Sequence, residues 1–266
     1  MKYILSVFVL IICIPAFAVE NKRTYIFGVF PHLPKHKLLE LYDQVAINFS
    51  VNLKNKIRIK TKSSFESFEA TLRAEEFDIV LIQPFDYPDA HDKYNYLPLA
   101  KRSDKLFSIL LVKKESSFKS IKDLKNRTIA NPAKSAAVTR LTDRTMIKNG
   151  FNPQKDFIRK YKSNHFSCMQ SVLIGTSDAC GTSYRALLHY EDEKMKNRFR
   201  VVNTSEKIPH VLYIVHKRVP KTDREILLKT ILNWPNSPEG RRILKTSRMV
   251  RFEKANDNDY DILRNK

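Results

Sequence analysis

The sequence predicts an α/β protein built of two similar lobes. A mostly apolar run, Phe77–Ile82, ends abruptly in polar and aromatic side chains, as the buried parallel strands of open sheets do. Strands and amphipathic helices alternate along the chain, which is typical of a mostly parallel sheet. The pattern of Ser64–Ile79 recurs in Asn164–Ala179, which indicates two lobes with a cleft between them.

The first half of the chain carries three predicted strands and two predicted helices. Apolar residues at helical spacing predict the helices, and runs of apolar, often β-branched residues predict the strands. Ser64 is the expected N-cap of the second helix. In order, the elements are a strand at Tyr25–Val29, a helix at Leu38–Leu53, a strand at Ile57–Lys60, a helix from Phe65 and a strand at Phe77–Ile82.

The second half repeats this alternation and then returns toward the first lobe. The tail after Phe252 is polar, and we expect it to be poorly anchored. The predicted elements are strands at Thr128–Ala130, Asp156–Tyr161, Ser177–Gly181 and Val211–His216, and helices at Ser135–Asn149, His165–Ile174, Thr222–Trp234 and Pro238–Thr246.

These elements predict two Rossmann-like lobes joined by a two-crossing hinge, with the ligand cleft between them. Residues 22–103 and 216–266 are expected to form lobe 1, and residues 104–215 lobe 2. Open sheets bind ligands outside the carboxyl ends of their strands. We therefore expect the site where the strand ends of both lobes meet.

Residues 1–18 have the pattern of a secretory signal peptide. One charge, Lys2, precedes the apolar run Tyr3–Ile14, and Pro15–Ala18 follows with a small-x-small cleavage pattern at Ala16 and Ala18. A membrane anchor is the alternative, but this run is shorter than the roughly 20 residues that a spanning helix needs. We expect cleavage after Ala18 and a periplasmic product.

Basic residues outnumber acidic ones along the whole chain. There are 48 Lys and Arg against 28 Asp and Glu, a net charge of +20, and loss of Lys2 leaves 47 against 28, or +19. Such a charge attracts anionic solutes or membrane surfaces. The basic residues are scattered, without a basic tail or a nucleic-acid motif. We expect a monomer that binds a small anionic ligand and no nucleic acid.

The start of the helix after Asn131 is a candidate anion site. Pro132 ends the strand, and the small residues Ser135, Ala136 and Ala137 leave the first backbone N–H groups of the helix uncovered. A helix N-terminus carries partial positive charge and free donors, so it favours an anion. Lys134 adds a full positive charge; an ordinary capped helix start is the alternative.

Polar and aromatic residues at the other strand ends would complete the cleft. For any one of them, capping or packing is an equally good interpretation, but together they lie where such sheets bind ligands. These candidates are Phe30, His32, Ser64, Gln83, Asp86, Tyr87, Asn164, His165, Thr182, Ser183 and Tyr184.

Cys168 and Cys180 are the two cysteines beyond the signal peptide. An even count in an exported protein indicates a disulfide, and the internal repeat places them where Phe68 and Val80 stand in the first half. A helix packed on the following strand could bring the two within bonding reach. Two buried free thiols are the alternative.

Several motifs, in order, resemble a known family. They are Gly28–Pro31, Ser64–Phe68, Phe77–Val80 with Pro84–Tyr87, Asn131–Pro132 with the small-residue helix start, and Gly175–Ala179. From Tyr25 to Val219 the chain is similar to the phosphate/phosphite/phosphonate-type periplasmic substrate-binding proteins of ABC importers. The resemblance implies two lobes that close on an oxyanion held by Lys134–Ala137, delivery to a membrane permease, and no cofactor or catalysis.

Three departures from the family pattern put the ligand in doubt. Lys134–Ala137 stands where members often have Ser-Thr-Ser-Gly, Phe166 replaces a glutamate that grips a substrate amine, and His210 replaces an aspartate. An ammonium group needs a buried carboxylate partner. We therefore expect a compact anion, or one with an apolar or acidic substituent, to bind better than 2-aminoethylphosphonate, with Asp86 the remaining acid.

Two other function classes stay open. The same cleft could serve a ligand-sensing module that reports to a membrane receptor kinase. An exported thiol or metal enzyme could use His165 with Cys168, or His32 with His36. Neither pair has a third ligand or an orienting carboxylate at suitable spacing, so we expect no enzyme and no metal site.

Overall fold

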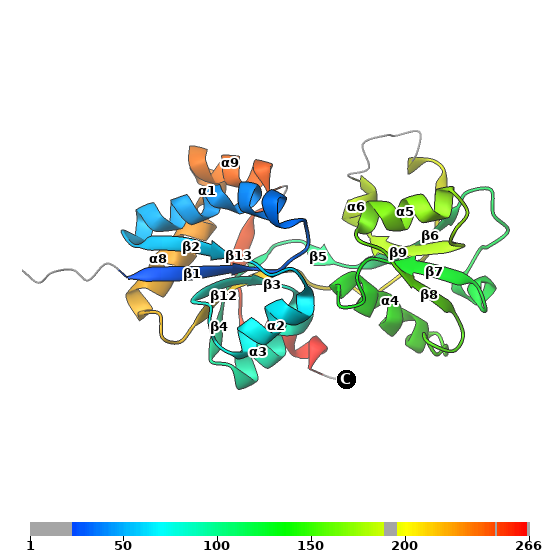
Figure 1. Ribbon diagram of the computed structural model, residues 1–266, viewed down its shortest axis with the longest axis horizontal. Coiled ribbons are helices and arrows are strands. Elements are labelled where there is room, and N and C mark those ends of the chain that lie inside the picture. The colour runs from blue at the N-terminus through cyan, green and yellow to red at the C-terminus, as the bar shows by residue number, and fades with distance from the viewer. Residues whose placement is uncertain (1–22, 189–195, 248, 265–266) are drawn as a thin grey trace, which may run out of the picture.

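The structure is a computed structural model that describes residues 23–188, 196–247 and 249–264 (Figure 1). Two lobes lie side by side, and each has a central sheet with helices against it. The predicted signal peptide and its cleavage site lie outside the described residues. Within these three ranges, no helix is both long enough and apolar enough to span a bilayer.

The first lobe contains a six-stranded sheet in the order β13-β4-β12-β3-β1-β2. Strands β1, β2 and β3 are parallel, as the sequence predicts. The strands are β1 (Thr24–Val29), β2 (Lys56–Lys60), β3 (Ile79–Ile82), β4 (Tyr96–Arg102), β12 (Leu212–His216) and β13 (Phe252–Lys254). The helices are α1 (Lys35–Leu53), α2 (Phe65–Arg73), η1 (Pro84–Asp86), α3 (Tyr87–Lys93), α8 (Lys221–Leu232), η3 (Trp234–Asn236), α9 (Pro238–Thr246) and η4 (Asp257–Leu263).

The second lobe contains a five-stranded sheet in the order β10-β6-β9-β7-β8. Strands β7, β8 and β9 are parallel, and β6 runs antiparallel to β9. The strands are β6 (Ser108–Lys113), β7 (Thr128–Asn131), β8 (Ile158–Tyr161), β9 (Ala179–Ser183) and β10 (Phe199–Thr204). The helices are η2 (Ile121–Leu124), α4 (Ala137–Lys148), α5 (His165–Leu173) and α6 (Tyr184–Leu188).

A two-stranded ribbon joins the lobes. It consists of β5 (Lys105–Leu106) and β11 (Ile208–Pro209), which pair antiparallel where the chain crosses between the sheets (Figure 1). We call it the hinge ribbon. The following strand β12 pairs with β3 and β4, so its hydrogen bonds place it in the first sheet, although the range predicted for lobe 2, 104–215, includes all of it except His216.

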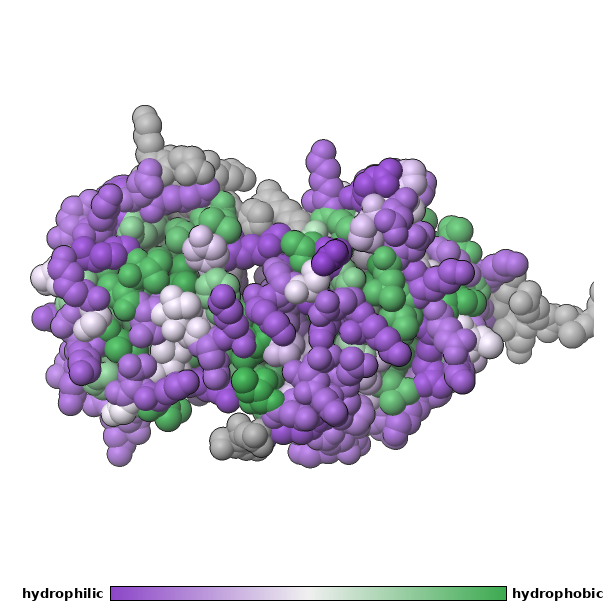
Figure 2. All heavy atoms as spheres, turned by 180° about the vertical axis from the view of Figure 1, so that it is seen from behind, coloured by the Kyte–Doolittle hydropathy of each residue, from purple (hydrophilic) through white to green (hydrophobic). Residues whose placement is uncertain are grey.

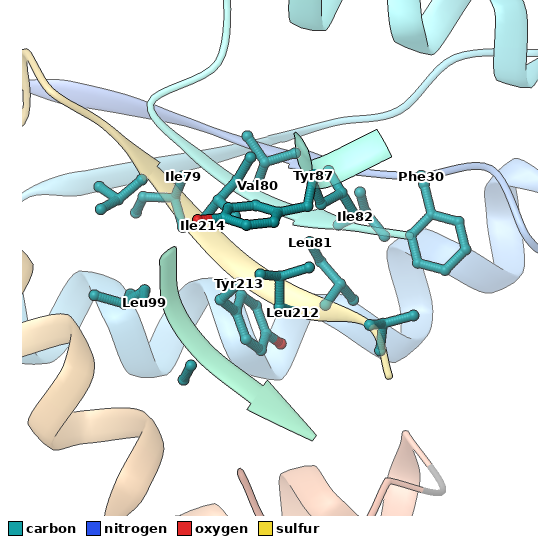
Figure 3. Close-up of a cluster of buried hydrophobic side chains, with 14 of the residues drawn as sticks. Phe30, Ile79, Val80, Leu81, Ile82, Tyr87, Leu99, Leu212, Tyr213 and Ile214 are labelled. Carbon is teal, nitrogen blue, oxygen red and sulfur yellow. The ribbon is translucent and has the colours of Figure 1, made fainter. Parts of the chain in front are cut away.

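The core of the first lobe explains why strand β3, Ile79–Ile82, is apolar throughout. Strand β3 lies in the middle of the sheet, between β1 and β12, and all its residues are buried. Figure 3 shows its side chains packed with Leu212, Tyr213 and Ile214 of β12. A central strand covered on both faces has no solvent-facing positions, so polar alternation disappears.

The internal repeat is visible in hydrogen bonds as well as in sequence. Asp78 accepts the Ile26 N–H at 2.8 Å, and Asp178 accepts the Thr128 N–H at 2.8 Å, each pinning one strand to its neighbour. Helices α2 and α5 both begin with a capping box, at Ser64 and at Asn164 respectively. The two lobes therefore repeat one local design.

The predicted disulfide is present between Cys168 of α5 and Cys180 of β9. Their Cα atoms are 5.6 Å apart, within the range that disulfides occupy. Both residues are fully buried in the core of the second lobe. The bond fastens the helix to the strand beneath it.

The C-terminal tail is anchored, contrary to the expectation from its polar composition. Strand β13 pairs with β4, and Phe252 packs against Trp234 and Tyr213 in the core. Tyr260 of η4 is fully buried and donates to the His210 carbonyl at 3.0 Å. Two aromatic side chains thus hold a segment that is otherwise polar.

Candidate functional site

A cleft of about 740 Å³ lies between the two lobes. Its walls are formed by residues that follow or precede strands at the facing edges of both sheets, where open α/β sheets bind ligands. Lobe 1 contributes the ends of β1, β3 and β4 and the start of β12. Lobe 2 contributes the ends of β7, β8 and β9 and the start of β6.

Positive charge gathers at the hinge side of the cleft. Arg102 donates to Asp104 through Nε at 3.0 Å and Nη2 at 2.6 Å, and Arg185 donates to the same carboxylate at 3.3 Å. Lys105 and Lys207, at the hinge ribbon, also line the cleft. We call Arg102, Lys105, Arg185 and Lys207 the hinge cations. Asp104 is the one carboxylate among the described residues that line the cleft.

His210 and Tyr42 line the cleft next to Arg102. The Val211 N–H donates to His210 Nδ1 at 2.7 Å, so Nε2 carries the hydrogen in the neutral ring. Burial lowers the pKa of His210 well below 6.5, and the charges of Arg102 and Arg185 lower it further. His210 therefore offers a neutral Nε2–H donor to a ligand.

The middle of the cleft is bridged by Gln83. Its Oε1 accepts the Ala137 N–H at 2.8 Å, and its Nε2 donates to the Ser135 carbonyl at 3.3 Å. Helix α4 begins at Ala137, with Ala136 as its N-cap, two residues later than the sequence predicts. One donor of the predicted anion site is therefore bound to the Gln83 side chain in this structure.

Two neutral imidazoles occupy the other end of the cleft, one from each lobe. His32 Nδ1 lies 3.0 Å from the Phe30 carbonyl oxygen, and His165 Nδ1 lies 2.7 Å from Thr182 Oγ1. Burial lowers the pKa of His32 to about 4, against the Phe30 hydrogen bond. Burial likewise lowers the pKa of His165 to about 4, and the nearby His32 adds to the shift. Both rings are uncharged at neutral pH.

The structure brings nine of the fifteen predicted ligand-binding residues to the cleft. Their role in binding stays a prediction. These nine are Phe30, His32, Gln83, Ala136, Ala137, Asn164, His165, Ser183 and Tyr184. The other six, outside the lining, are Ser64, Asp86, Tyr87, Lys134, Ser135 and Thr182.

Tyr87 and Asp86 are directed away from the cleft because the chain turns helical after Gln83. Tyr87 begins α3, is fully buried, and donates to Asp257 at 2.8 Å. Asp86 is buried next to Arg140 of α4, at 3.5 Å. Burial raises the pKa of Asp86 to about 6, although Arg140 opposes the shift.

The remaining four residues have local structural partners or are exposed. Ser64 caps α2 by accepting the Ser67 N–H, and Thr182 contacts the His165 ring. Lys134 is exposed. Burial raises the pKa of Asp143, and the charges of Arg159 and Lys134 oppose that shift. Ser135 contributes its carbonyl to Gln83.

Sequence reasoning missed the hinge cations and Asp104. They lie where the chain crosses between lobes, so their proximity depends on the path of the hinge ribbon. The motif Arg102-Ser103-Asp104-Lys105 did fall at the predicted lobe boundary, and its charge density was the available signal. A search of the predicted lobe boundaries for charged residues, in addition to the strand ends, would have found this motif.

A family model described as "ABC transporter, phosphonate, periplasmic substrate-binding protein" matches residues 27–260. No curated protein sequence is significantly similar to the chain.

Solved structures show the same fold at low sequence identity. A binding protein component of an ABC phosphonate transporter from Pseudomonas aeruginosa has 16% identity and a TM-score of 0.78 over 92% of this chain and 85% of that chain. PhnD1 from Prochlorococcus marinus, in complex with methylphosphonate, has 16% identity and a TM-score of 0.79 over 91% and 96%. A Xanthomonas citri protein bound to ATP has 14% identity and a TM-score of 0.75 over 91% and 94%.

The family match covers most of the chain, and these structures agree with it in fold. This chain belongs to the family of periplasmic substrate-binding proteins of phosphonate ABC transporters, the solute-binding components of importers.

Proposed function

We propose that the cleft captures a small phosphorus oxyanion, a phosphonate, phosphite or phosphate, and delivers it to an importer permease. The observation that carries this proposal is the charge of the cleft: four cationic side chains face one carboxylate among the described lining residues. In a partly desolvated cleft such an excess favours an anion. The relatives that hold methylphosphonate and ATP support a phosphorus oxyanion as the ligand.

The helix α4 start is proposed to hold the oxyanion. The Val138 N–H has no hydrogen-bond partner among the described residues, and the Ala137 N–H becomes available if the ligand displaces the Gln83 side chain. Free N–H groups and the helix dipole both favour negative charge at this point. Lys134 is exposed, so in this proposal its contribution is a long-range one.

Capture is proposed to involve closure of the two lobes about the hinge ribbon. The predicted boundaries near residue 103 and residue 216 then become flexible points near β5 and β11, with β12 moving as part of lobe 1. Hinge closure around a ligand is a common mode in two-lobed binding proteins. Binding and release, without chemistry on the ligand, complete the proposed role.

The face shown in Figure 2 supports the proposal of a monomer. Hydrophilic residues cover most of the face in Figure 2, and hydrophobic residues form separate areas among them. Extensive interfaces usually expose larger continuous apolar patches. We further propose that the mature chain begins at Val19, after cleavage at Ala18.

Calorimetry on ligand-stripped protein tests the proposed ligand class. Phosphate, phosphite and methylphosphonate are titrated into the wild type, Ala137→Asp and Ala70→Asp. Asp at position 137 suits a helix start but repels an anion there. Ala70 is exposed on α2 and provides the matched charge change.

We expect binding of at least one oxyanion to the wild type and to Ala70→Asp. For Ala137→Asp the affinity should fall about tenfold or more, since two negative charges about 4 Å apart repel by roughly 4 kcal/mol at an effective dielectric constant near 20. Absence of binding by all three oxyanions would overturn the proposed ligand class. Unchanged affinity in Ala137→Asp would place the ligand away from α4.

A further inference from the structure

The cleft is longer than a compact anion, and its two ends differ in chemistry. In the second sheet, Phe107 precedes β6, and helix α4 follows β7, two strands away. Arg185 follows β9, next to β7, but its guanidinium bonds Asp104 and so lies beside Arg102. Adjacent strands are about 4.8 Å apart, so the β6 edge and the β7 edge are about 10 Å apart. In the first sheet, Arg102 ends β4 and Gln83 follows β3, again two strands away.

Each end of the cleft is formed by residues from both lobes. The hinge end combines Arg102 of lobe 1 with Arg185 and Lys207, while the far end combines His32 of lobe 1 with His165 of lobe 2. Between them the α4 start lies against Gln83. An oxyanion bound at the α4 start therefore lies about two strand spacings from the end of the strand that carries Arg102.

The volume of the cleft also exceeds the need of a compact anion. About 740 Å³ falls within the range of pockets that hold drug-sized ligands. Methylphosphonate would leave the hinge end to water. The free space therefore allows a substituent that extends from the α4 start toward the hinge.

Arg185 has donors available at the hinge end. Asp104 accepts only its Nη1, and its Nε is buried without a hydrogen-bond partner among the described residues. The Nε has almost no accessible surface, so a ligand would meet the outer nitrogens of this partly exposed guanidinium, of which Asp104 bonds Nη1. The guanidinium fork matches a carboxylate, as Arg102 shows with Asp104.

We propose that the ligand carries two acidic groups, a phosphorus oxyanion at the α4 start and a carboxylate at the hinge cations. This inference rests on the proposed function and names its substrate class: carboxyalkylphosphonates and related molecules with an acidic group at each end. Arg185 is the specificity-determining residue, with Lys105 and Lys207 adding positive charge at the rim. Asp104 holds the Arg102 and Arg185 guanidinium groups in place.

An ammonium substituent is disfavoured at the same position. Asp104, the carboxylate that faces the cleft among the described residues, is shared by two arginines. Asp86, the other acid near the strand ends, lies outside the cleft lining and is paired with Arg140. A cationic tail would meet the hinge cations without an unpaired acid, and an uncompensated charge in a closed cleft is costly.

The test compares matched pairs of ligands that differ only in the terminal carboxylate. Alkylphosphonates and ω-carboxyalkylphosphonates of increasing chain length are titrated calorimetrically into the wild type, Arg185→Gln and Arg58→Gln. Arg58 is exposed on β2, outside the cleft lining, so both variants lose one charge and only one loses a hinge cation. The readout is the affinity ratio within each pair, which cancels effects common to both ligands.

In the wild type and Arg58→Gln, the carboxylate should tighten binding about tenfold or more at one chain length. In Arg185→Gln this ratio should fall close to one. The inference is overturned if the wild-type ratio is near one at every chain length, or if Arg185→Gln keeps the wild-type ratio. In either case, binding of methylphosphonate would still support the proposed function. Failure of every phosphonate to bind overturns the inference, and it overturns the proposed function as well if phosphate and phosphite also fail to bind.

Discussion

Gln83 links the two lobes through a single side-chain amide. Its oxygen accepts the Ala137 N–H, and its nitrogen donates to Ser135 and to Asp86 at 3.2 Å, all in a buried position. Replacing it with leucine keeps its approximate size but removes every one of these bonds. The Ala137 N–H and the Asp86 carboxylate then lose a partner away from bulk water.

Gln83→Leu should therefore lower the free energy of unfolding by about 1–3 kcal/mol. Urea unfolding of the wild type and the variant measures the difference. Gln154→Leu, at an exposed position of the second lobe, is the matched control and should change stability little. Equal stability of Gln83→Leu and the wild type would show that the bridge between the lobes contributes nothing net.

Asp86 gives a pH-dependent prediction with a definite sign. Burial raises its pKa from 3.8 to about 6, so the folded state holds a proton that the unfolded state has released. The wild type loses stability from this group as pH rises from about 4 to above 6. Asp86→Asn removes that loss.

The difference in unfolding free energy, Asp86→Asn minus wild type, should rise between pH 4 and pH 7 by on the order of 3 kcal/mol. Urea unfolding across this range measures it. Taking the difference cancels the opposite trend of His32 and His165, whose lowered pKa values cost stability as pH falls from 6.5 toward 4. A flat difference would show that Asp86 titrates normally.

At the scale of elements, the order of strands and helices could be predicted because each carried a clear pattern. Strand β3 is an unbroken apolar run, and α1 places Leu38, Tyr42 and Phe49 on one buried face. Helix α3 was missed because Tyr87–Lys93 has only two apolar residues, Tyr87 and Ala90, and no repeated apolar face. Because this helix was not predicted, Tyr87 was assigned to the cleft although it is buried in the core.

The disulfide between α5 and β9 makes a prediction at this scale. A closed loop of 12 residues' separation should contribute about 3 kcal/mol in the chain-entropy model. Reductant should therefore lower the urea midpoint of the wild type, and should leave the Cys168→Ala, Cys180→Ala double variant unchanged. An unchanged wild-type midpoint, with both thiols shown to be alkylated, would contradict the prediction.

At the scale of the whole molecule, the two-lobed form could be predicted from the internal repeat, but the interior of the cleft could not. His32, Asn164, His165 and Tyr184 follow strands and were predicted on that basis. The hinge cations depend on two crossings of the chain that meet in the hinge ribbon. Their proximity depends on the tertiary structure, so no local sequence pattern predicts it.

Closure of the lobes about the hinge ribbon should be visible in solution. Saturating methylphosphonate should decrease the radius of gyration of the wild type in small-angle X-ray scattering, because the cleft between the lobes closes. Ala137→Asp, which is expected to bind poorly, should show a smaller decrease at the same concentration. An identical scattering curve with and without bound ligand would indicate that capture occurs without closure.

The central claim is that a cationic cleft selects an anion. Calorimetry of ligand-stripped protein with methylphosphonate and 2-aminoethylphosphonate tests it most directly, because the second ligand adds an ammonium group to the same oxyanion. With Asp104 shared by Arg102 and Arg185, the account predicts that methylphosphonate binds more tightly. Tighter binding of 2-aminoethylphosphonate would contradict it, since an unpaired carboxylate would then have to face the ligand.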